Sequence, residues 1–256
     1  MTELAVASLR KSFGTVRAVD GVSFRLSGGE FLALIGPNGA GKSTCFNMIN
    51  GQLAPDAGSI RFDGHDIAGL PARKIARRGI ARTFQIAATF GSMTVAENVQ
   101  MALIAHGGET YRLWRPARFY HRARSLELLA QVGMEAAADR LCRELSYGDI
   151  KRVELAIALS AEPRLLLMDE PTAGMAPGER HQLIALVKRL VVDRGIAVLF
   201  TEHSMDVVFA FADRIIVMAR GHLIADGDAA TVRNDAQVRE VYFGRDRTVA
   251  RAGRAL

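Results

Sequence analysis

A run rich in glycine and hydroxyl residues stands between an apolar segment and a helical pattern. It consists of Gly36, Pro37, Asn38, Gly39, Ala40, Gly41, Lys42, Ser43 and Thr44. Glycines let backbone N–H groups turn toward phosphate oxygens, Lys42 can reach the outer phosphates, and the Ser43 hydroxyl suits Mg²⁺. The apolar run 31–35 and the helical pattern 44–49 are the flanks that such a loop requires. The segment predicts a P-loop that cradles a nucleotide.

An acidic pair, Asp169 and Glu170, follows a second apolar run at residues 165–168. An acid that ends a strand beside a P-loop is the usual protein partner of Mg²⁺, often through water. The adjacent Glu170 could polarise an attacking water as a general base. Two carboxylates that merely cap a strand end are the plainer alternative, which the P-loop disfavours.

A third segment, residues 145–149, precedes apolar positions at helical spacing from 153 to 159. Ser146 can cap that helix, and Asp149 suits its first turn. A helix N-terminus that carries Ser146 and Gly148 can also receive an anion. The position of this segment about twenty residues before the acidic pair favours the second role, an anion site.

Two further polar residues, Gln85 and His203, have the character of ordinary surface residues when each is taken singly.

The elements that must position these residues follow from hydrophobic periodicity. The continuous apolar runs 31–35, 165–168, 196–200 and 215–218 predict the centre of a parallel sheet covered on both faces. Polar residues at their carboxyl ends lie where such sheets bind ligands. Residues 4–10 and 19–26 alternate more nearly and predict antiparallel strands, with Gly14 and Gly21 in turns, and 61–66 predicts a hairpin end. Residues 93–160 are mainly helical in pattern, with a capped start at Thr94 and Glu97, a helix over 122–132 and a long loop over 107–120.

Composition limits the class of protein. The 256 residues are 49% hydrophobic and 23% charged, typical of a folded domain. No apolar run approaches the roughly 20 residues of a membrane-spanning helix. The net charge of +6 is mostly scattered, which favours a solvated basic surface over attraction to a membrane. Cys45 and Cys142 lack metal-ligand spacing and are expected to be free thiols.

In this order the P-loop, Gln85, segment 145–149, the acidic pair and His203 resemble the ABC-type ATPases over roughly residues 4–244. The resemblance implies an α/β fold: a P-loop NTPase core with a mixed or parallel sheet, an N-terminal antiparallel β subdomain and an inserted helical subdomain. The implied bounds are 1–84 and 160–244 for the ATP-binding core, 85–159 for the helical subdomain and 245–256 for a basic tail.

The resemblance also implies residue roles. Phe13 matches the aromatic that stacks on adenine, and Gln85 the glutamine that touches Mg²⁺ and water and begins the link to a membrane partner. His203 matches the switch histidine at the γ-phosphate. Ser146 and Gly148 match the signature that contacts the ATP of an opposing subunit. The implied catalytic set is Glu170, His203, Gln85 and Lys42, and the implied Mg²⁺ set is Ser43, Gln85 and Asp169.

Two departures from the common family pattern stand out. Tyr147 replaces the usual signature glycine, in a form similar to ATPases of branched-chain amino-acid importers, and Asp149 is a tolerated variant. Ala176 stands where many members have aspartate, which implies weaker or differently wired communication between the two ATP sites. The segments 82–85, 93–98 and 241–244 are also similar to that importer subgroup.

The expected activity is ATP hydrolysis that drives import of branched-chain amino acids or related small solutes. The expected assembly is a head-to-tail homodimer, or a heterodimer with a second ABC ATPase, on integral membrane permease subunits at the cytoplasmic face of the membrane. A periplasmic solute-binding protein would act indirectly, and no nucleic-acid partner is expected. An exporter ATPase of the lipopolysaccharide type is the alternative within transport. A soluble ABC protein acting on ribosomes or DNA is disfavoured by the single P-loop and the absence of heptads, and a GTPase by the absence of Asn-Lys-x-Asp.

Overall fold

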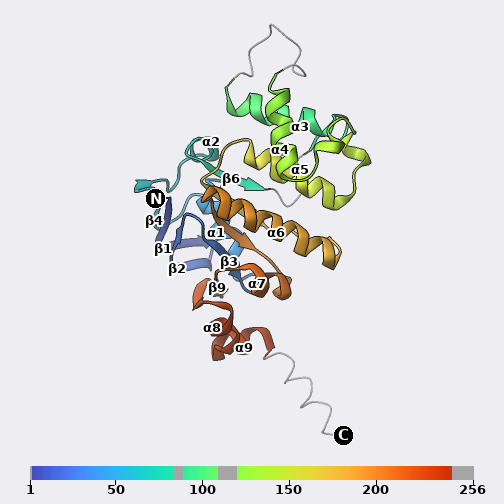
Figure 1. Cartoon of the computed structure of the whole chain (residues 1–256). Helices are drawn as coiled ribbons and strands as arrows, with labels where there is room; N and C mark the ends of the chain where they lie inside the picture. The colour runs from blue at the N-terminus through green and yellow to red at the C-terminus, as the bar shows by residue number, and fades with distance from the viewer. Residues whose placement is uncertain (1, 84–88, 109–119, 244–256) are drawn as a thin grey trace.

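A six-stranded mixed sheet forms the centre of the molecule (Figure 1). The computed structural model describes residues 2–83, 89–108 and 120–243. The strand order is β10-β9-β3-β8-β7-β6, with all neighbours parallel except β10 and β9. The strands are β3 Phe31–Ile35, β6 Ile80–Thr83, β7 Leu165–Asp169, β8 Ala197–Thr201, β9 Arg214–Ala219 and β10 His222–Gly227.

A second, antiparallel sheet has the order β2-β1-β4-β5. Its strands are β1 Glu3–Phe13, β2 Val16–Ser27, β4 Ala57–Phe62 and β5 His65–Asp66. The predicted antiparallel pair and the hairpin end at 61–66 are therefore confirmed. Gly14 lies in the β1–β2 turn, but the prediction of a turn at Gly21 was wrong, because Gly21 lies within β2 at a positive φ of 74°.

Nine α-helices cover these sheets in the described residues. They are α1 Lys42–Ile49, α2 Ala72–Ala76, α3 Val95–His106, α4 Arg122–Gln131, α5 Tyr147–Leu159, α6 Pro177–Arg194, α7 Met205–Phe211, α8 Ala229–Asn234 and α9 Ala236–Phe243. The predicted capping box at the start of α3 is present: Thr94 Oγ1 accepts from the Glu97 N–H, and the Glu97 carboxylate accepts from the Thr94 N–H. Ser146 caps α5 as predicted, since its Oγ accepts from the Asp149 N–H at 3.2 Å.

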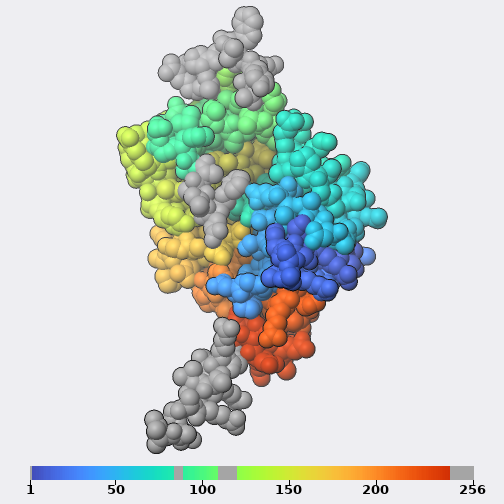
Figure 2. Space-filling model, turned by 180° about the vertical axis from the view of Figure 1, so that it is seen from behind, coloured from blue at the N-terminus to red at the C-terminus, as the bar shows by residue number. Residues whose placement is uncertain are grey.

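The central sheet is buried on both faces, as its continuous apolar strands predict. Phe31, Ala33 and Ile35 of β3 pack with the helical side, whereas Leu32 and Leu34 pack with α1 and the antiparallel sheet. Figure 1 shows α6 along the sheet and α3, α4 and α5 grouped at one end of the molecule. Figure 2 shows the opposite face, where the N-terminal strands in blue lie between that helical end and the C-terminal helices in red.

Two strands lie outside the sequence prediction. β6 is four residues long and has Arg82 inside it, so its apolar pattern is interrupted. β10, at the sheet edge, has no buried residue: His222 and Asp226 are exposed and the other four residues are half-buried. No helix in the described residues has the length and apolar character needed to cross a membrane.

Candidate functional site

The P-loop connects β3 to α1 at the carboxyl edge of the central sheet. Its backbone requires glycine at Gly36 and Gly41, which have φ of 152° and 105°. A Cβ would lie 2.2 Å from the carbonyl oxygen of Met218 at Gly36 and of Ala18 at Gly41. At Gly39, with φ 79°, a Cβ would meet no atom within 4 Å. The tip formed by Asn38, Gly39 and Ser43 is exposed, which leaves its N–H groups and one hydroxyl open to a ligand. A glycine-rich loop with an exposed tip at the start of a helix fits a chain of phosphates.

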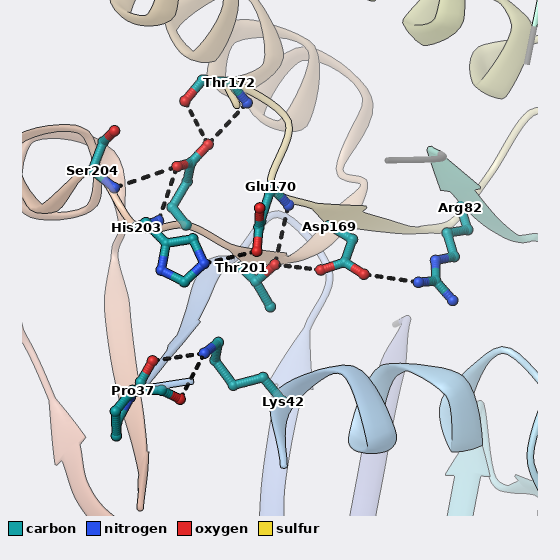
Figure 3. A network of polar contacts seen from close by, with 11 residues as sticks. Pro37, Lys42, Arg82, Asp169, Glu170, Thr172, Thr201, His203 and Ser204 are labelled. Atoms are coloured by element: carbon teal, nitrogen blue, oxygen red, sulfur yellow. Dashed lines mark hydrogen bonds and ion pairs between the residues drawn. The ribbon is translucent and has the colours of Figure 1, made fainter. Parts of the chain in front are cut away.

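Lys42 is the first residue of α1 and points back across the loop. Its Nζ donates to the carbonyl oxygens of Gly36 at 2.6 Å and Pro37 at 3.1 Å (Figure 3). Burial lowers the pKa of Lys42, and the negative charges of Glu170 and Asp169 raise it in opposition. The ammonium group therefore shares one electrostatic environment with the acidic pair, although these residues lie more than 120 positions apart in the chain.

Asp169 ends β7 and has both carboxylate oxygens engaged. Oδ1 accepts from Thr201 Oγ1 at 2.7 Å, and Oδ2 accepts from Arg82 Nη2 at 2.8 Å. The parallel register places Asp169 opposite Thr201. Because a carboxylate has about four lone-pair positions, these two bonds leave capacity for a water. The donor set of Ser43 hydroxyl and Asp169 carboxylate fits Mg²⁺, a hard cation that keeps several waters.

Glu170 and His203 form a pair across the carboxyl ends of β7 and β8. Glu170 Oε1 lies 2.7 Å from His203 Nε2. Glu170 adopts a left-handed backbone with φ 49°, and its N–H is held by the carbonyl oxygen of Thr201 at 3.1 Å. Non-glycine residues in this region cluster at functional sites, where surrounding contacts offset the strain. A carboxylate at such a position is suited to accept a proton from a water aligned by the imidazole.

The remaining predicted residues lie apart from this cluster or outside the described chain. Ser146 is exposed at the start of α5, and a Cβ on Gly148 would meet the Glu179 carboxylate at 3.5 Å. Within residues 2–83, 89–108 and 120–243, no hydrogen bond joins Ser146 to the P-loop. Phe13, at the end of β1, is 52% exposed, with Lys11 Nζ 5.9 Å from its ring centroid. Gln85 lies outside the described residues.

Four polar residues to which the sequence analysis assigned no role join the cluster. They are Arg82, Thr172, Thr201 and Glu202. Thr201 and Glu202 follow the same rule as the acidic pair, since they stand at the carboxyl end of a buried strand. No local pattern distinguishes Arg82 or Thr172, because their partners come from other segments.

Comparison with known proteins identifies the family of this chain. A family model described as ABC transporter matches residues 19–173, and one described as Branched-chain amino acid ATP-binding cassette transporter matches residues 222–248. The chain is 37% identical to the high-affinity branched-chain amino acid transport ATP-binding protein BraF of Pseudomonas aeruginosa, over 94% of this chain and 97% of the relative. It is 36% identical to the lipopolysaccharide export system ATP-binding protein LptB of Escherichia coli K12, over 96% and 99%.

Solved structures agree with the fold. The ADP conformation of an ATP-binding cassette of an ABC transporter aligns with a TM-score of 0.86 and 35% identity, over 95% of this chain and 99% of that one. A dimeric post-hydrolysis cassette bound to ADP and Pi aligns with a TM-score of 0.74 and 27% identity, over 88% and 98%. The predicted P-loop NTPase fold is thereby confirmed. Given the P-loop, the strand order and these matches, the chain belongs to the ABC transporter family and is an ATP-binding, ATP-hydrolysing transporter subunit.

Proposed function

We propose that this chain powers the import of branched-chain amino acids or related small solutes, as one half of an ATPase dimer on membrane permease subunits. The observation that carries the catalytic part is the convergence of Lys42, Asp169, Glu170 and His203 at one edge of the central sheet (Figure 3). The solute class rests on the named relatives and on the match at residues 222–248.

In this proposal Lys42 exchanges its bonds to the Gly36 and Pro37 carbonyls for the outer phosphates of ATP. The glycine-rich backbone donates to the same phosphates, and Phe13 stacks on the adenine. Ser43, Asp169 and Gln85 are the residues that would hold Mg²⁺. When bound, Mg²⁺ neutralises charge that builds up on the phosphate oxygens.

Glu170 then acts as the general base. The Glu170 carboxylate takes a proton from the attacking water. The His203 imidazole holds Glu170 Oε1 in place through their 2.7 Å contact, and it would face the γ-phosphate of bound ATP. Ser146 and Gly148 have no bond to the P-loop of their own chain in the described residues, and Ser146 is exposed. They therefore serve the ATP of a second chain, in a head-to-tail homodimer or heterodimer.

The proposed location is the cytoplasmic face of the inner or plasma membrane, where the dimer is held by its permease subunits. A solute-binding protein in the periplasm would deliver the cargo to the permeases. The proposed units are a core formed by 1–84 and 160–244, a helical subdomain formed by 85–159 and a tail formed by 245–256. The packing of α3, α4 and α5 with one another supports the grouping of these helices, although they share one hydrophobic core with the central sheet.

Glu170→Gln tests the catalytic proposal. The variant is expected to bind ATP with unchanged affinity, lose turnover by at least about a hundredfold, and elute as an ATP-dependent dimer in gel filtration. The amide keeps the shape of the side chain but cannot accept the proton. Glu144→Gln, at an exposed position, is the matched control. A Glu170→Gln chain that hydrolyses ATP at the normal rate would remove Glu170 as the base.

A lipopolysaccharide-type exporter is the second candidate, because the identity to LptB is close to that of the importer relatives. Reconstitution of this chain with its membrane permease subunits separates the two. ATP-dependent accumulation of leucine in vesicles supports import. Extraction of lipopolysaccharide without amino-acid uptake supports export.

A further inference from the structure

Glu202 is a buried carboxylate at the junction of two functional loops. It follows the last residue of β8, precedes His203, and is 4% exposed. The dashed lines that start at Thr172, at the His203 backbone and at Ser204 in Figure 3 end on this carboxylate. None of the proposed chemical steps uses it.

Each oxygen of Glu202 serves a different loop. Oε1 accepts from the Thr172 N–H at 2.9 Å and from Thr172 Oγ1 at 2.6 Å. Oε2 accepts from the His203 N–H at 3.1 Å and, more weakly, from the Ser204 N–H at 3.5 Å. Both loops thus present donors toward one point, and only a group with two acceptor oxygens satisfies both of them.

The two loops carry the two members of the Glu170–His203 pair. Thr172 lies two residues after Glu170, and the His203 backbone is bonded directly. Arg180 of α6 adds a second connection: its Nε donates to the Met175 carbonyl and its Nη1 donates to Ser204 Oγ at 2.8 Å. These hydrogen bonds therefore connect the loop after β7 to the loop after β8, in addition to the contact between Glu170 and His203.

We propose that Glu202 is a positioning residue for ATP hydrolysis, which holds the backbones under Glu170 and His203 at the separation their contact requires. The inference rests on the proposed roles of those two residues. Glu202 also links the loop after β7, at Thr172, to the loop that carries His203 within one chain. Glu202 acts through the pair and does not touch the phosphates.

Glu202→Gln and Thr172→Val test this role in the purified full-length chain with MgATP. Glutamine keeps one acceptor oxygen but turns an NH₂ group toward N–H donors, so one loop is released. We expect kcat to fall about tenfold or more, with KM and the calorimetric Kd for ATP within about twofold of the unsubstituted chain. Thr172→Val should lower kcat about threefold, and Thr172→Ser, which restores the hydroxyl, should recover most of that loss. Glu97→Gln is the matched control, because glutamine also serves in a capping box.

The two substitutions should not add. Since both release the same contact, the double variant is expected to be no slower than Glu202→Gln alone by more than about twofold. A Glu202→Gln rate within twofold of normal, losses that multiply in the double variant, or a Kd that rises in step with the fall in kcat would each overturn the proposal. If Glu202→Gln lacks a cooperative thermal transition, the comparison of Thr172→Val with Thr172→Ser decides. A normal rate in Glu170→Gln would instead show that the proposed site has failed, whatever Glu202 does.

Discussion

Cys45 lies on α1, three residues after the P-loop lysine, and its thiol is fully buried. Burial raises the pKa of Cys45 to about 12 and also raises the pKa of Cys142, which is 1% exposed. Neither thiol is in a disulfide. Their chemistry is therefore that of small core residues, although one of them lies beside the nucleotide loop.

Thiol reactivity is predicted to be very low in the folded chain. At pH 8 a pKa of about 12 leaves roughly one Cys45 in 10⁴ as the reactive thiolate. Ellman's reagent should label the native protein slowly and both cysteines rapidly in guanidinium chloride. Val192→Cys, at a position 67% exposed, provides the reactive control. Native labelling as fast as that of the control would contradict the buried environment.

The acidic pair shows how neighbouring carboxylates acquire different tasks. Asp169 is held by Thr201 and Arg82, so its position is defined by two bonds. Glu170 faces His203, whose side chain is 51% exposed, and so lies at the edge that a water can reach. In the proposed mechanism, these different partners assign Asp169 to the metal side and leave Glu170 as the base.

At the scale of the element, N-terminal caps fix the first residues of two helices, α3 and α5. Thr94 starts α3 with a reciprocal capping box, and Ser146 starts α5. Both helices hold buried apolar residues in the same cluster that covers one face of the sheet. Local hydrogen bonds at the caps and long-range packing therefore act on the same helices.

Thr94→Ala is predicted to destabilise the chain by about 1 kcal/mol, because the Glu97 N–H loses its side-chain acceptor. Urea unfolding followed by circular dichroism measures the change. Thr94→Ser keeps the hydroxyl and should lose less than half as much. An unfolding free energy that is the same for Thr94→Ala and the unsubstituted chain would show that the cap adds no stability.

At the scale of the whole molecule, the described geometry divides into a nucleotide side and a signature side. The P-loop cluster lies at the sheet edge, and the start of α5 presents Ser146 and the half-exposed Tyr147 elsewhere on the surface. In the proposed assembly, a single chain would therefore carry both halves of an ATP site, at separate places on its surface. The dimeric cassette among the aligned structures supports a partner chain as the means of joining them.

Ser146→Arg is predicted to block dimer closure while it leaves ATP binding to the monomer intact. In a Glu170→Gln background, gel filtration with ATP should show a monomer, and calorimetry an unchanged Kd. The bulky cation would stand where the other chain's γ-phosphate and loop must approach. Gln237→Arg, on an exposed position of α9, controls for the added charge. A normal ATP-dependent dimer of the Ser146→Arg chain would argue against the shared site.

Much of the fold could be predicted from local sequence patterns. The strand, glycine loop and helix around Lys42 could be predicted because each depends on residues within one short segment. The same holds for the caps at Thr94 and Ser146 and for the four buried strands. β3 has the predicted bounds, and β7, β8 and β9 differ from theirs by one residue at one or both ends. β6 and β10 were not predicted, because short edge strands have interrupted or mixed hydrophobic patterns.

The sequence by itself determined which residue types could bind a nucleotide and in which elements they stand. Only the tertiary structure decided that Lys42, Asp169, Glu170 and His203 meet, because the strand order places β8 between β3 and β7 and gathers their carboxyl ends. The tertiary structure also decided which groups Arg82 and Glu202 bind, namely Asp169 and Thr172. Their partners lie in distant segments, and a hydrogen bond between distant segments exists only once the sheet has brought their ends together.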